Sequence, residues 1–235
     1  FVYRVHDIPD PEKLDTLNSF ILRFGHKIKP EGTKTEVAKS INALLDKVQG
    51  RPEENLIETI AIRTMSKAIY PTKNVGHYGL AFDYYTHFTS PIRRYPDMMV
   101  HRLLEHYLAG GKSVNQGDLE EECKHCSQME QVAANAERDS IKYKQVEYMQ
   151  ERIGEEFDAT ISGVSEWGVY VEEVNTKAEG MIKLRDMTDD FYELNEKLYA
   201  IVGKTSGKKY SLGDKVRVKL VASDPEKKTL DFQFI

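Results

Sequence analysis

Two adjacent arginines, Arg93 and Arg94, follow a serine and a proline in the stretch FTSPIRRYPD. Ser90 followed by Pro91 is typical of a helix start, with Ser90 as the cap and Pro91 as the first helical residue. Positive charge is unfavourable at that end, because free backbone N–H groups and the helix dipole already make it positive. A guanidinium there becomes favourable once an anion binds beside it. The stretch therefore predicts an anion site.

A second group of residues with chemical potential lies near the other end of the chain. Trp167 and Tyr170 flank Gly168, and the basic residues Lys183 and Arg185 follow. Aromatic rings that alternate with cations on one face suit single-stranded nucleic acid, because the rings stack on bases and the cations neutralise phosphates. The alternative is that Trp167 and Tyr170 are core residues.

Composition limits the classes of protein that could carry these groups. The chain has 235 residues, of which 40% are hydrophobic and 30% charged, enough for one large or two smaller soluble domains. Neither an apolar run long enough for a membrane span nor a signal peptide is evident, so no membrane association is expected. Only two cysteines occur, Cys123 and Cys126, which excludes a disulfide framework and favours a reducing cytoplasm.

Charge alone does not identify a nucleic-acid binder. The net charge of −5 argues against binding through bulk positive charge. Locally, residues 204–219 hold six basic residues and one acidic residue. A basic face within an acidic protein is compatible with RNA.

Residues 1–153 are predicted to be mainly helical, because apolar residues recur there at helical spacing. The expected helices run from Pro11 to Gly25, over 34–48, from near Pro52 to Met65, from Pro91 to Leu108 and from about Leu119 to Arg152. Pro96 lies inside the fourth helix and is expected to kink it or to separate its first turn.

After Gly154 the apolar pattern changes from helical to alternating. Short β-rich runs are separated by Gly, Asp and Pro clusters: EFDATISGVSEWGVYVEEV, EGMIKL, KVRVKLVASD and KTLDFQFI. This pattern predicts a small antiparallel barrel or sandwich in residues 154–235.

The landmarks GVYV, EGM and LGDKVRVKL followed by LDFQF recur in the order of an S-one-type OB-fold domain. Residues 154–235 resemble this RNA-binding family. The resemblance implies a five-stranded barrel in which Trp167 and Tyr170 face RNA. Lys183 stands where the family often has a histidine, so contact with RNA through a cation is expected there in place of ring stacking.

The stretch GHYGLAFDYYTHFTSPIRRYPDMMVHRLL, residues 76–104, resembles the signature of the RNB catalytic domain of the RNase II/RNase R exoribonucleases. YRVHDIPDPEKL near the start and CSQMEQVAANAERD at residues 126–139 agree with the same family in the same order. An RNB domain followed by a barrel is the arrangement of the bacterial RNase R branch. The resemblance implies an α+β chain, with the mainly helical carboxy-terminal part of an RNB domain in residues 1–153 and an antiparallel five-stranded OB-fold barrel in residues 154–235.

The resemblance also assigns roles around the two arginines. It implies that Arg93 contacts the phosphate that is cleaved and stabilises the charge that develops on it. Thr89 and Ser90 are candidates to cap the helix or to donate hydrogen bonds nearby. Arg94 either shares the task of Arg93 or pairs with a core carboxylate, and the pairing is slightly favoured.

Three further residues are assigned to RNA with an alternative beside each. His77 and Tyr78, in a glycine-flanked loop, are expected to line the site of the 3′-terminal nucleotide, and the alternative for both is packing. Glu137 matches a family glutamate near the last nucleotides. An ion pair between Glu137 and an arginine of another helix is about equally favoured.

The metal site of the family is not predicted in this chain. Hydrolysis in the family uses Mg²⁺ held by clustered aspartates, which lie upstream of the segment where this chain begins. Two other groups of aspartates do not replace that cluster: Asp186, Asp189 and Asp190 in the barrel, and Asp7 and Asp10 near the start. The two cysteines of CKHC lack a second ligand pair, so zinc is not expected.

The sequence therefore predicts part of a longer, monomeric protein. The parent is expected to be a processive, Mg²⁺-dependent 3′-to-5′ exoribonuclease that releases nucleoside 5′-monophosphates from single-stranded RNA. Its partners are RNA and the upstream part of its own catalytic domain. This chain alone is expected to bind RNA weakly without hydrolysing it. The alternatives are a non-catalytic RNA-binding regulatory protein of the same fold and a structural module with a protein-binding barrel.

Overall fold

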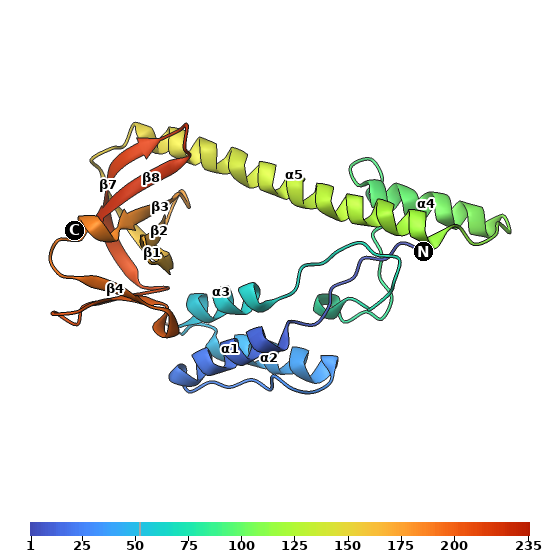
Figure 1. Ribbon diagram of the computed structural model, residues 1–235, viewed down its shortest axis with the longest axis horizontal. Coiled ribbons are helices and arrows are strands. Elements are labelled where there is room, and N and C mark those ends of the chain that lie inside the picture. The colour runs from blue at the N-terminus through green and yellow to red at the C-terminus, as the bar shows by residue number, and fades with distance from the viewer. Residues whose placement is uncertain (52) are drawn as a thin grey trace. The chain divides into compact units, whose positions relative to one another are not determined.

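The computed structural model describes residues 1–51 and 53–235, which form two compact units, Phe1–Asn135 and Ala136–Ile235. The first unit is mainly helical and the second is built around a closed barrel of five strands (Figure 1). The predicted α+β fold class is therefore confirmed. The predicted domain boundary, between residues 153 and 154, lies in the turn after helix α5 (Gln116–Gln150), whereas the two compact units divide within α5.

The first helix, α1 (Pro11–Ile21), begins and ends as the sequence indicates. The Asp10 side chain caps it by accepting a hydrogen bond from the Glu12 N–H at 2.9 Å. After a single 3₁₀ turn, Gly25 ends the segment with φ of 75°, a left-handed conformation that glycine adopts without strain. The buried face contains Phe20, whereas Phe24 is exposed.

Two further helices pack with α1. Helix α2 (Lys34–Val48) starts with a capping box in which Thr33 and Glu36 satisfy each other's backbone N–H groups. Its buried residues are Val37, Ile41, Leu44 and Val48, and the predicted Leu45 is half-buried. Helix α3 spans Glu54–Thr64. Its predicted start near Pro52 lies outside the described residues.

Helix α4 spans Tyr95–Leu108, so the predicted start at Pro91 is wrong, whereas the predicted separation of the first turn by Pro96 is confirmed. The reason is Pro96, whose ring would clash with the carbonyl of Ile92 four residues earlier if the helix were continuous. Residues 91–93 form a separate turn, and the helix begins again with Pro96 in its first turn. Gly110, at φ of 80°, follows its end.

A small apolar core holds the segments that carry the predicted site. It joins the chain start and the segment around residue 70 to α4 and the first part of α5, through Val2, Tyr70, Met99, Val100, Leu103, Leu119, Cys123 and Cys126. No helix in the described part of the chain has the length and apolar character needed to cross a bilayer.

The barrel consists of β1 (Glu156–Ser165), β2 (Gly168–Glu173), β3 (Glu179–Lys183), β7 (Lys215–Asp224) and β8 (Thr229–Phe234), in the closed order β1-β2-β3-β8-β7. The prediction of entirely antiparallel pairing is wrong at one place, because β3 and β8 pair in parallel through Met181 and Asp231. Five strands cannot alternate in direction all the way around a closed ring, so one neighbouring pair must run parallel.

The barrel core is formed by alternate residues of the strands, and α5 covers part of it. Val169 and Val171 of β2 are fully buried, and Val146 and Met149 of α5 belong to the same apolar cluster. The Ser223 hydroxyl donates to the Val146 carbonyl at 2.9 Å, which fixes the end of α5 to β7.

A second sheet, absent from the sequence prediction, lies between β3 and β7 in the chain. It contains β4 (Tyr192–Asn195), β5 (Ala200–Gly203) and β6 (Lys209–Ser211). Asp190 organises its turn by accepting hydrogen bonds from the backbone N–H groups of Thr205 and Ser206 and from the Ser206 hydroxyl. These donors hold the pKa of Asp190 far below its ordinary value. Asp190 therefore has a structural task in this loop.

Candidate functional site

The two arginines lie in a turn, Ser90–Arg94, that precedes α4; we call this segment the arginine turn. The Ser90 carbonyl accepts the Arg94 N–H at 3.0 Å and the Arg93 N–H at 3.3 Å. The prediction that Ser90 caps the helix is wrong. Arg94 occupies the cap position, and no side chain caps the helix there. The Ser90 N–H instead donates to Asp97 Oδ2 at 2.7 Å.

Arg94 pairs with a core carboxylate, the arrangement favoured by the sequence. Its Nη2 donates to Asp97 Oδ2 at 2.9 Å, and the Asp97 side chain is fully buried. Burial alone would raise the pKa of Asp97, but the hydrogen bonds from Arg94 and the Ser90 N–H lower it overall. The charge of Arg94 is therefore compensated within the protein.

Arg93 is exposed and differs from Arg94 in its partners. Its Nη2 lies 3.5 Å from the Ser90 hydroxyl oxygen, at the limit of a hydrogen bond. Over residues 1–51 and 53–235, no carboxylate lies within ion-pair distance of Arg93. The preceding Thr89 is also exposed. The arginine turn thus presents one uncompensated guanidinium to solvent.

A network of contacts that was not predicted lies near Arg94. The Tyr70 hydroxyl lies 2.8 Å from His87 Nδ1, and burial raises the pKa of Tyr70 to about 12. Burial also lowers the pKa of His87, and the nearby Arg94 lowers it further. The Arg4 guanidinium lies 4.5 Å from the centre of the Tyr70 ring and 2.7 Å from Glu130 Oε2. The neutral form of His87 is therefore favoured.

His77 and Tyr78 belong to a cluster of rings that leads to His87. The His77 ring centre lies 5.3 Å from that of His6 and 5.1 Å from that of Tyr85, and Tyr85 lies 5.8 Å from His87. Burial is the main cause of the lowered pKa of His77, and the charges of His6 and Arg4 add to it. Burial raises the pKa of Tyr78. Both predicted residues thus pack inside an aromatic cluster beside the arginine turn.

Three buried polar atoms in this region lack a hydrogen-bond partner within the described chain: Tyr78 Oη, Arg94 Nε and Asp97 Oδ1. An unpaired buried polar group costs about 1–3 kcal/mol. Native structures contain few of them, so each requires an explanation. All three belong to residues of the arginine turn, the helix that follows it, or the predicted nucleotide site.

Glu137 lies in the second unit, on the exposed surface of α5. None of the ion pairs formed by described residues includes it. The other α-helices belong to the first unit, so an ion pair between Glu137 and an arginine of another helix stays a prediction. No ligand contact is assigned to Glu137 by this position alone.

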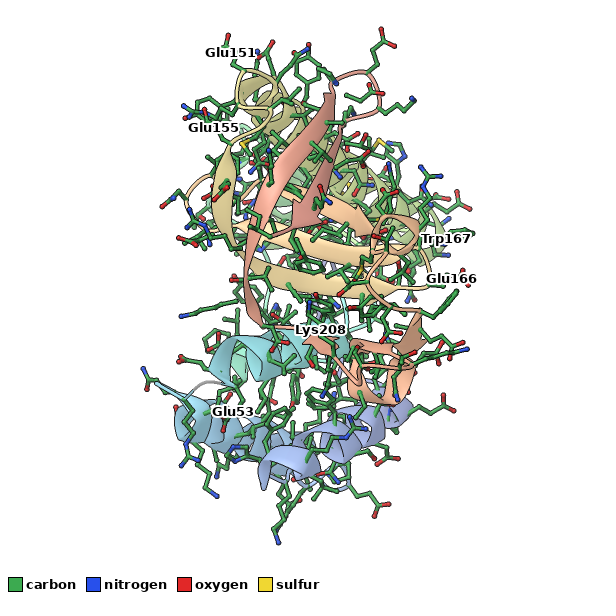
Figure 2. All side chains as sticks on the ribbon, turned by 90° about the vertical axis from the view of Figure 1, so that its left-hand side faces the viewer. Glu53, Glu151, Glu155, Glu166, Trp167 and Lys208 are labelled. Atoms are coloured by element: carbon green, nitrogen blue, oxygen red, sulfur yellow. The ribbon has the colours of Figure 1, made fainter. Side chains whose placement is uncertain are left out.

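In the barrel, Trp167 and Tyr170 lie outside the core. Trp167 occupies the turn between β1 and β2 with 69% of its surface exposed (Figure 2). Tyr170 is half-buried on β2, opposite Gly163 of β1 and Met181 of β3, while its neighbours in the strand point inward. The alternative that Trp167 is a core residue is therefore wrong.

The predicted cations of the barrel already have carboxylate neighbours. Lys183 Nζ forms an ion pair with Asp231 of β8, a residue that the sequence analysis did not single out. Arg185 is exposed, with its Nε 3.7 Å from Asp186 Oδ1. A cation paired with a surface carboxylate can still exchange partners when a phosphate arrives.

The basic run at residues 204–219 is less positive than its composition indicates. Lys204 pairs with Glu193, and Lys208 Nζ lies 3.5 Å from Asp189 Oδ2. Arg217 Nη1 lies 3.1 Å from Asp158 Oδ1 on the neighbouring strand. Three of the six basic residues are therefore partly neutralised by acidic residues outside the run.

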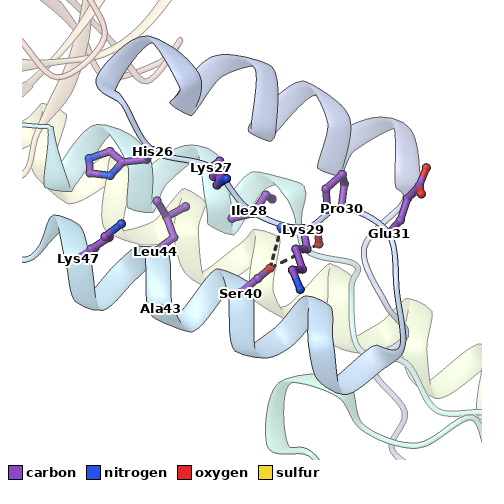
Figure 3. A pocket seen from close by; sticks show the side chains of 10 residues that line it. All are labelled: His26, Lys27, Ile28, Lys29, Pro30, Glu31, Ser40, Ala43, Leu44 and Lys47. Carbon is purple, nitrogen blue, oxygen red and sulfur yellow. Dashed lines mark hydrogen bonds between the residues drawn. The ribbon is translucent and has the colours of Figure 1, made fainter.

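Elsewhere, a cavity of about 680 Å³ lies between α2 and residues 26–31 (Figure 3). Its lining includes the apolar residues Ile28 and Leu44, and none of the predicted site residues lines it.

Burial raises the pKa of Cys123 to about 12, so this thiol is a poor metal ligand at neutral pH. The described residues contain no group of three His, Cys, Asp or Glu side chains arranged to hold a metal ion.

Comparison with known proteins places each unit in a family. The RNB domain matches residues 1–110, and the S1 RNA binding domain matches residues 150–234. Ribonuclease R of Aquifex aeolicus is 41% identical over the whole chain. The match covers 33% of that protein, so the chain spans about a third of the length of the curated relatives it matches.

Solved structures agree with these matches. The apo form of Mycoplasma genitalium RNase R superposes with a TM-score of 0.89 at 26% identity, covering 100% of this chain and 38% of that one. The same protein in complex with ribose methylated single-stranded RNA gives a TM-score of 0.86, with the same identity and coverage.

Proposed function

Because this chain belongs to the RNase II/RNase R family, we propose that it supplies the phosphate-contacting arginine and the RNA-binding barrel of an exoribonuclease. The parent enzyme shortens single-stranded RNA from its 3′ end and releases nucleoside 5′-monophosphates. The full reaction belongs to the longer protein, of which this chain corresponds to about a third.

The observation that carries the proposal is the difference between two neighbouring arginines. Arg94 is compensated by the buried Asp97, whereas Arg93 is exposed and has no carboxylate partner in the described chain. An unpaired guanidinium attracts a phosphate, and its planar fork of donors fits phosphate oxygens. Arg93 is thus suited to the phosphate, and Arg94 to holding the turn.

In the proposed mechanism, Arg93 binds an oxygen of the phosphate that is cleaved. Negative charge increases on these oxygens as the nucleophile attacks, so a fixed cation stabilises the transition state more than the ground state. The hydrogen bonds that Asp97 accepts from the Ser90 N–H and from Arg94 keep the turn in place. The arginine therefore needs little reorganisation during the reaction.

The proposed Mg²⁺ of the parent enzyme has no ligand set among the described residues of this chain. The metal would be held by the upstream part of the catalytic domain. The residues described here would act on the RNA without contacting the metal. For the same reason we propose that this chain alone binds RNA but releases no mononucleotide from it.

The barrel and the aromatic cluster are proposed to hold the RNA strand. Trp167 and Tyr170 present rings outside the barrel core, and Lys183 lies opposite Gly168 on the neighbouring strand. Base stacking on such rings contributes about 1–3 kcal/mol per base. His77 and Tyr78 are proposed to line the site of the last nucleotide, where the unpaired Tyr78 hydroxyl would find a partner.

Replacement of Arg93 by alanine in the full-length protein tests the proposal. The rate of nucleotide release at saturating RNA should fall by about 10²–10³, as is typical when a group that stabilises transition-state charge is removed. RNA affinity, measured separately by fluorescence anisotropy, should change only a few-fold.

Arg102→Ala is the matched control, because Arg102 is also an exposed arginine and lies on α4. That variant should keep its rate. Unchanged turnover in the Arg93→Ala variant would contradict the catalytic role and favour the non-catalytic RNA-binding alternative.

A further inference from the structure

A cavity of about 590 Å³ lies beside Trp167, between the β1–β2 turn and the segment that joins β4 to β5. The side chains that determine its chemistry are Glu166 and Trp167 on one side and Glu196 and Tyr199 on the other. Figure 2 shows Glu166 and Trp167 next to each other at this edge of the second unit. Two aromatic and two acidic residues therefore line one hollow.

The indole of Trp167 is exposed although its backbone is fixed. The backbone N–H of Trp167 donates to the Ser165 hydroxyl at 3.2 Å, and the backbone carbonyl of Trp167 accepts the Leu184 N–H at 3.0 Å. These bonds tie the residue to the ends of β1 and β3. A flat ring held in this way can stack on another flat ring at little entropic cost.

Tyr199 has a similarly defined position. Its φ of 46° lies in the left-handed region, which is unusual for a residue with a bulky side chain. The Tyr199 N–H donates to the Glu196 carbonyl at 3.2 Å, and its own carbonyl accepts the Leu212 N–H at 3.0 Å. Backbone hydrogen bonds therefore fix the position of Tyr199 on the side of the cavity opposite Trp167.

The two glutamates are distinctive because neither has an ion-pair partner among the described side chains. Many other carboxylates of the barrel surface have a cation, such as Asp158 with Arg217 and Asp231 with Lys183. Glu166 and Glu196 take part in no ion pair between described side chains, and the described lining of the cavity includes no lysine or arginine. Such a hollow repels a phosphate.

Carboxylate oxygens only accept hydrogen bonds, so they select a ligand edge that carries donors. Among the RNA bases, guanine presents two adjacent donors on its Watson–Crick edge, N1–H and the N2 amino group. One carboxylate can accept from both at once. Uracil presents one donor between two carbonyl oxygens, and inosine lacks the amino group of guanine.

We propose that this cavity is a guanine-preferring nucleobase site, in which Trp167 stacks on the base and Glu166 or Glu196 accepts from its donor edge. The inference rests on the proposed RNA-binding function of the barrel and adds a base preference to it. Phosphates of the same strand would remain on the side of Lys183, away from the carboxylates.

The test uses the 235-residue chain and oligouridylates of twelve nucleotides that carry one central guanosine, one central inosine or only uridine. Trp167 is the single tryptophan of the chain, so quenching of its fluorescence reports on this cavity directly. Anisotropy of a labelled oligonucleotide gives the affinity in parallel. The guanosine oligonucleotide should bind at least about fivefold more tightly than the other two, the lower end for a bidentate base contact.

Two variants separate the cavity from general RNA affinity. In Glu166→Gln and Glu196→Gln, at least one variant should lose the guanosine preference, and both should bind the all-uridine oligonucleotide more tightly because repulsion of the strand is reduced. Glu151→Gln is the matched control, since Glu151 is exposed at the end of α5 and lies well apart from Trp167 in Figure 2. It removes the same charge and should keep the preference.

The outcomes distinguish this inference from the function on which it rests. Equal affinity for guanosine and inosine, or a preference that survives in both variants, would overturn the base site while leaving the RNA-binding barrel intact. Absence of any RNA binding would instead overturn the proposed function as well. Quenching of Trp167 by N-acetylarginine amide at lower concentration than by guanosine would show a site for a cation and contradict the proposal.

Discussion

The arginine turn and the basic run at residues 204–219 carry positive charge in opposite ways. The basic run contains six cations, but Lys204, Lys208 and Arg217 lie beside acidic residues. The arginine turn contains only two, and one of them is free of any carboxylate in the described chain. The location of available positive charge is therefore determined by pairing, and a count of basic residues along the sequence is a poor guide to it.

Local geometry causes the difference. In the barrel, the antiparallel register places Arg217 opposite Asp158, and Arg217 forms ion pairs with both Asp158 and Glu156 across the strands. In the arginine turn, Asp97 lies three residues after Arg94 on the first turn of α4 and reaches that arginine alone. The Nη2 of Arg93 instead lies 3.5 Å from the Ser90 hydroxyl oxygen.

The two units also stabilise their buried carboxylates differently. Asp97 depends on a cation, Arg94, together with one backbone N–H. Glu173 of β2 is almost fully buried and depends on neutral donors, the backbone N–H groups of Asn175 and Thr176 and the Thr176 hydroxyl. Removing one group from each arrangement tests which kind of support the unit requires.

The largest effect is expected for Asp97→Ala. The variant leaves Arg94 half-buried without its partner and frees the Ser90 N–H, so the first unit should lose about 3 kcal/mol of stability. Urea unfolding of the chain followed by far-UV circular dichroism measures this, because the first unit is mainly helical. Asp118→Ala, an exposed aspartate in the first turn of α5, should cost less than about 1 kcal/mol. An equal loss of stability in the two variants would show that the hydrogen bonds of Asp97 do not stabilise the first unit.

A smaller effect is expected for Glu173→Gln. Burial alone would raise the pKa of Glu173, but the hydrogen bonds from Thr176 and Asn175 lower it below its ordinary value of 4.5. Because the pKa is lowered in the folded state, the carboxylate stabilises the barrel above about pH 4.5, and this contribution is lost as the pH falls further. In the variant, the glutamine turns its amide N–H₂ group toward the N–H and O–H donors around residue 173. The barrel should therefore lose about 2 kcal/mol of stability at pH 7.

Trp167 fluorescence measures the unfolding of the second unit at pH 7 and at pH 3. The difference between wild type and Glu173→Gln should be smaller at pH 3, below the ordinary pKa of 4.5, where protonation of this carboxyl in the unfolded chain reduces the contribution of the charge. A difference that is the same at both pH values would contradict the assigned role of the charge. Glu172→Gln, on the neighbouring position and half-exposed, provides the control.

The sequence predicted the architecture well where local rules decide it. The cap at Asp10, the stop at Gly25 and the alternating strands of the barrel follow from side-chain chemistry and periodicity. At the start of α4 two proline rules compete, and the predicted separation of the first turn by Pro96 is the one that is confirmed. Pro91 favours a first helical position, but Pro96 is incompatible with a helix that already includes Ile92.

The site could be predicted only in part, because its support comes from residues far apart in the chain. The exposed Arg93 follows from the motif, and the pairing of Arg94 was favoured in advance. The contact between Tyr70 and His87 and the placement of Arg4 over the Tyr70 ring depend on tertiary packing that no spacing reveals. Asp97 was detectable, since its spacing of three residues from Arg94 on a helix is a known pairing distance.

The smallest effect is expected for Arg217→Ala in the barrel. Its pairs with Glu156 and Asp158 are exposed, at 3.5 and 3.1 Å, and exposed pairs contribute little because solvent screens them. The variant should change stability by less than about 1 kcal/mol, and RNA affinity at 150 mM salt by less than about twofold. If the arginine turn differs from the basic run as described, loss of Arg217 merely releases two carboxylates that were already compensated. A tenfold loss of RNA affinity would mean that Arg217 exchanges its carboxylates for phosphate, and that paired surface cations contribute to RNA binding as much as the unpaired Arg93 does.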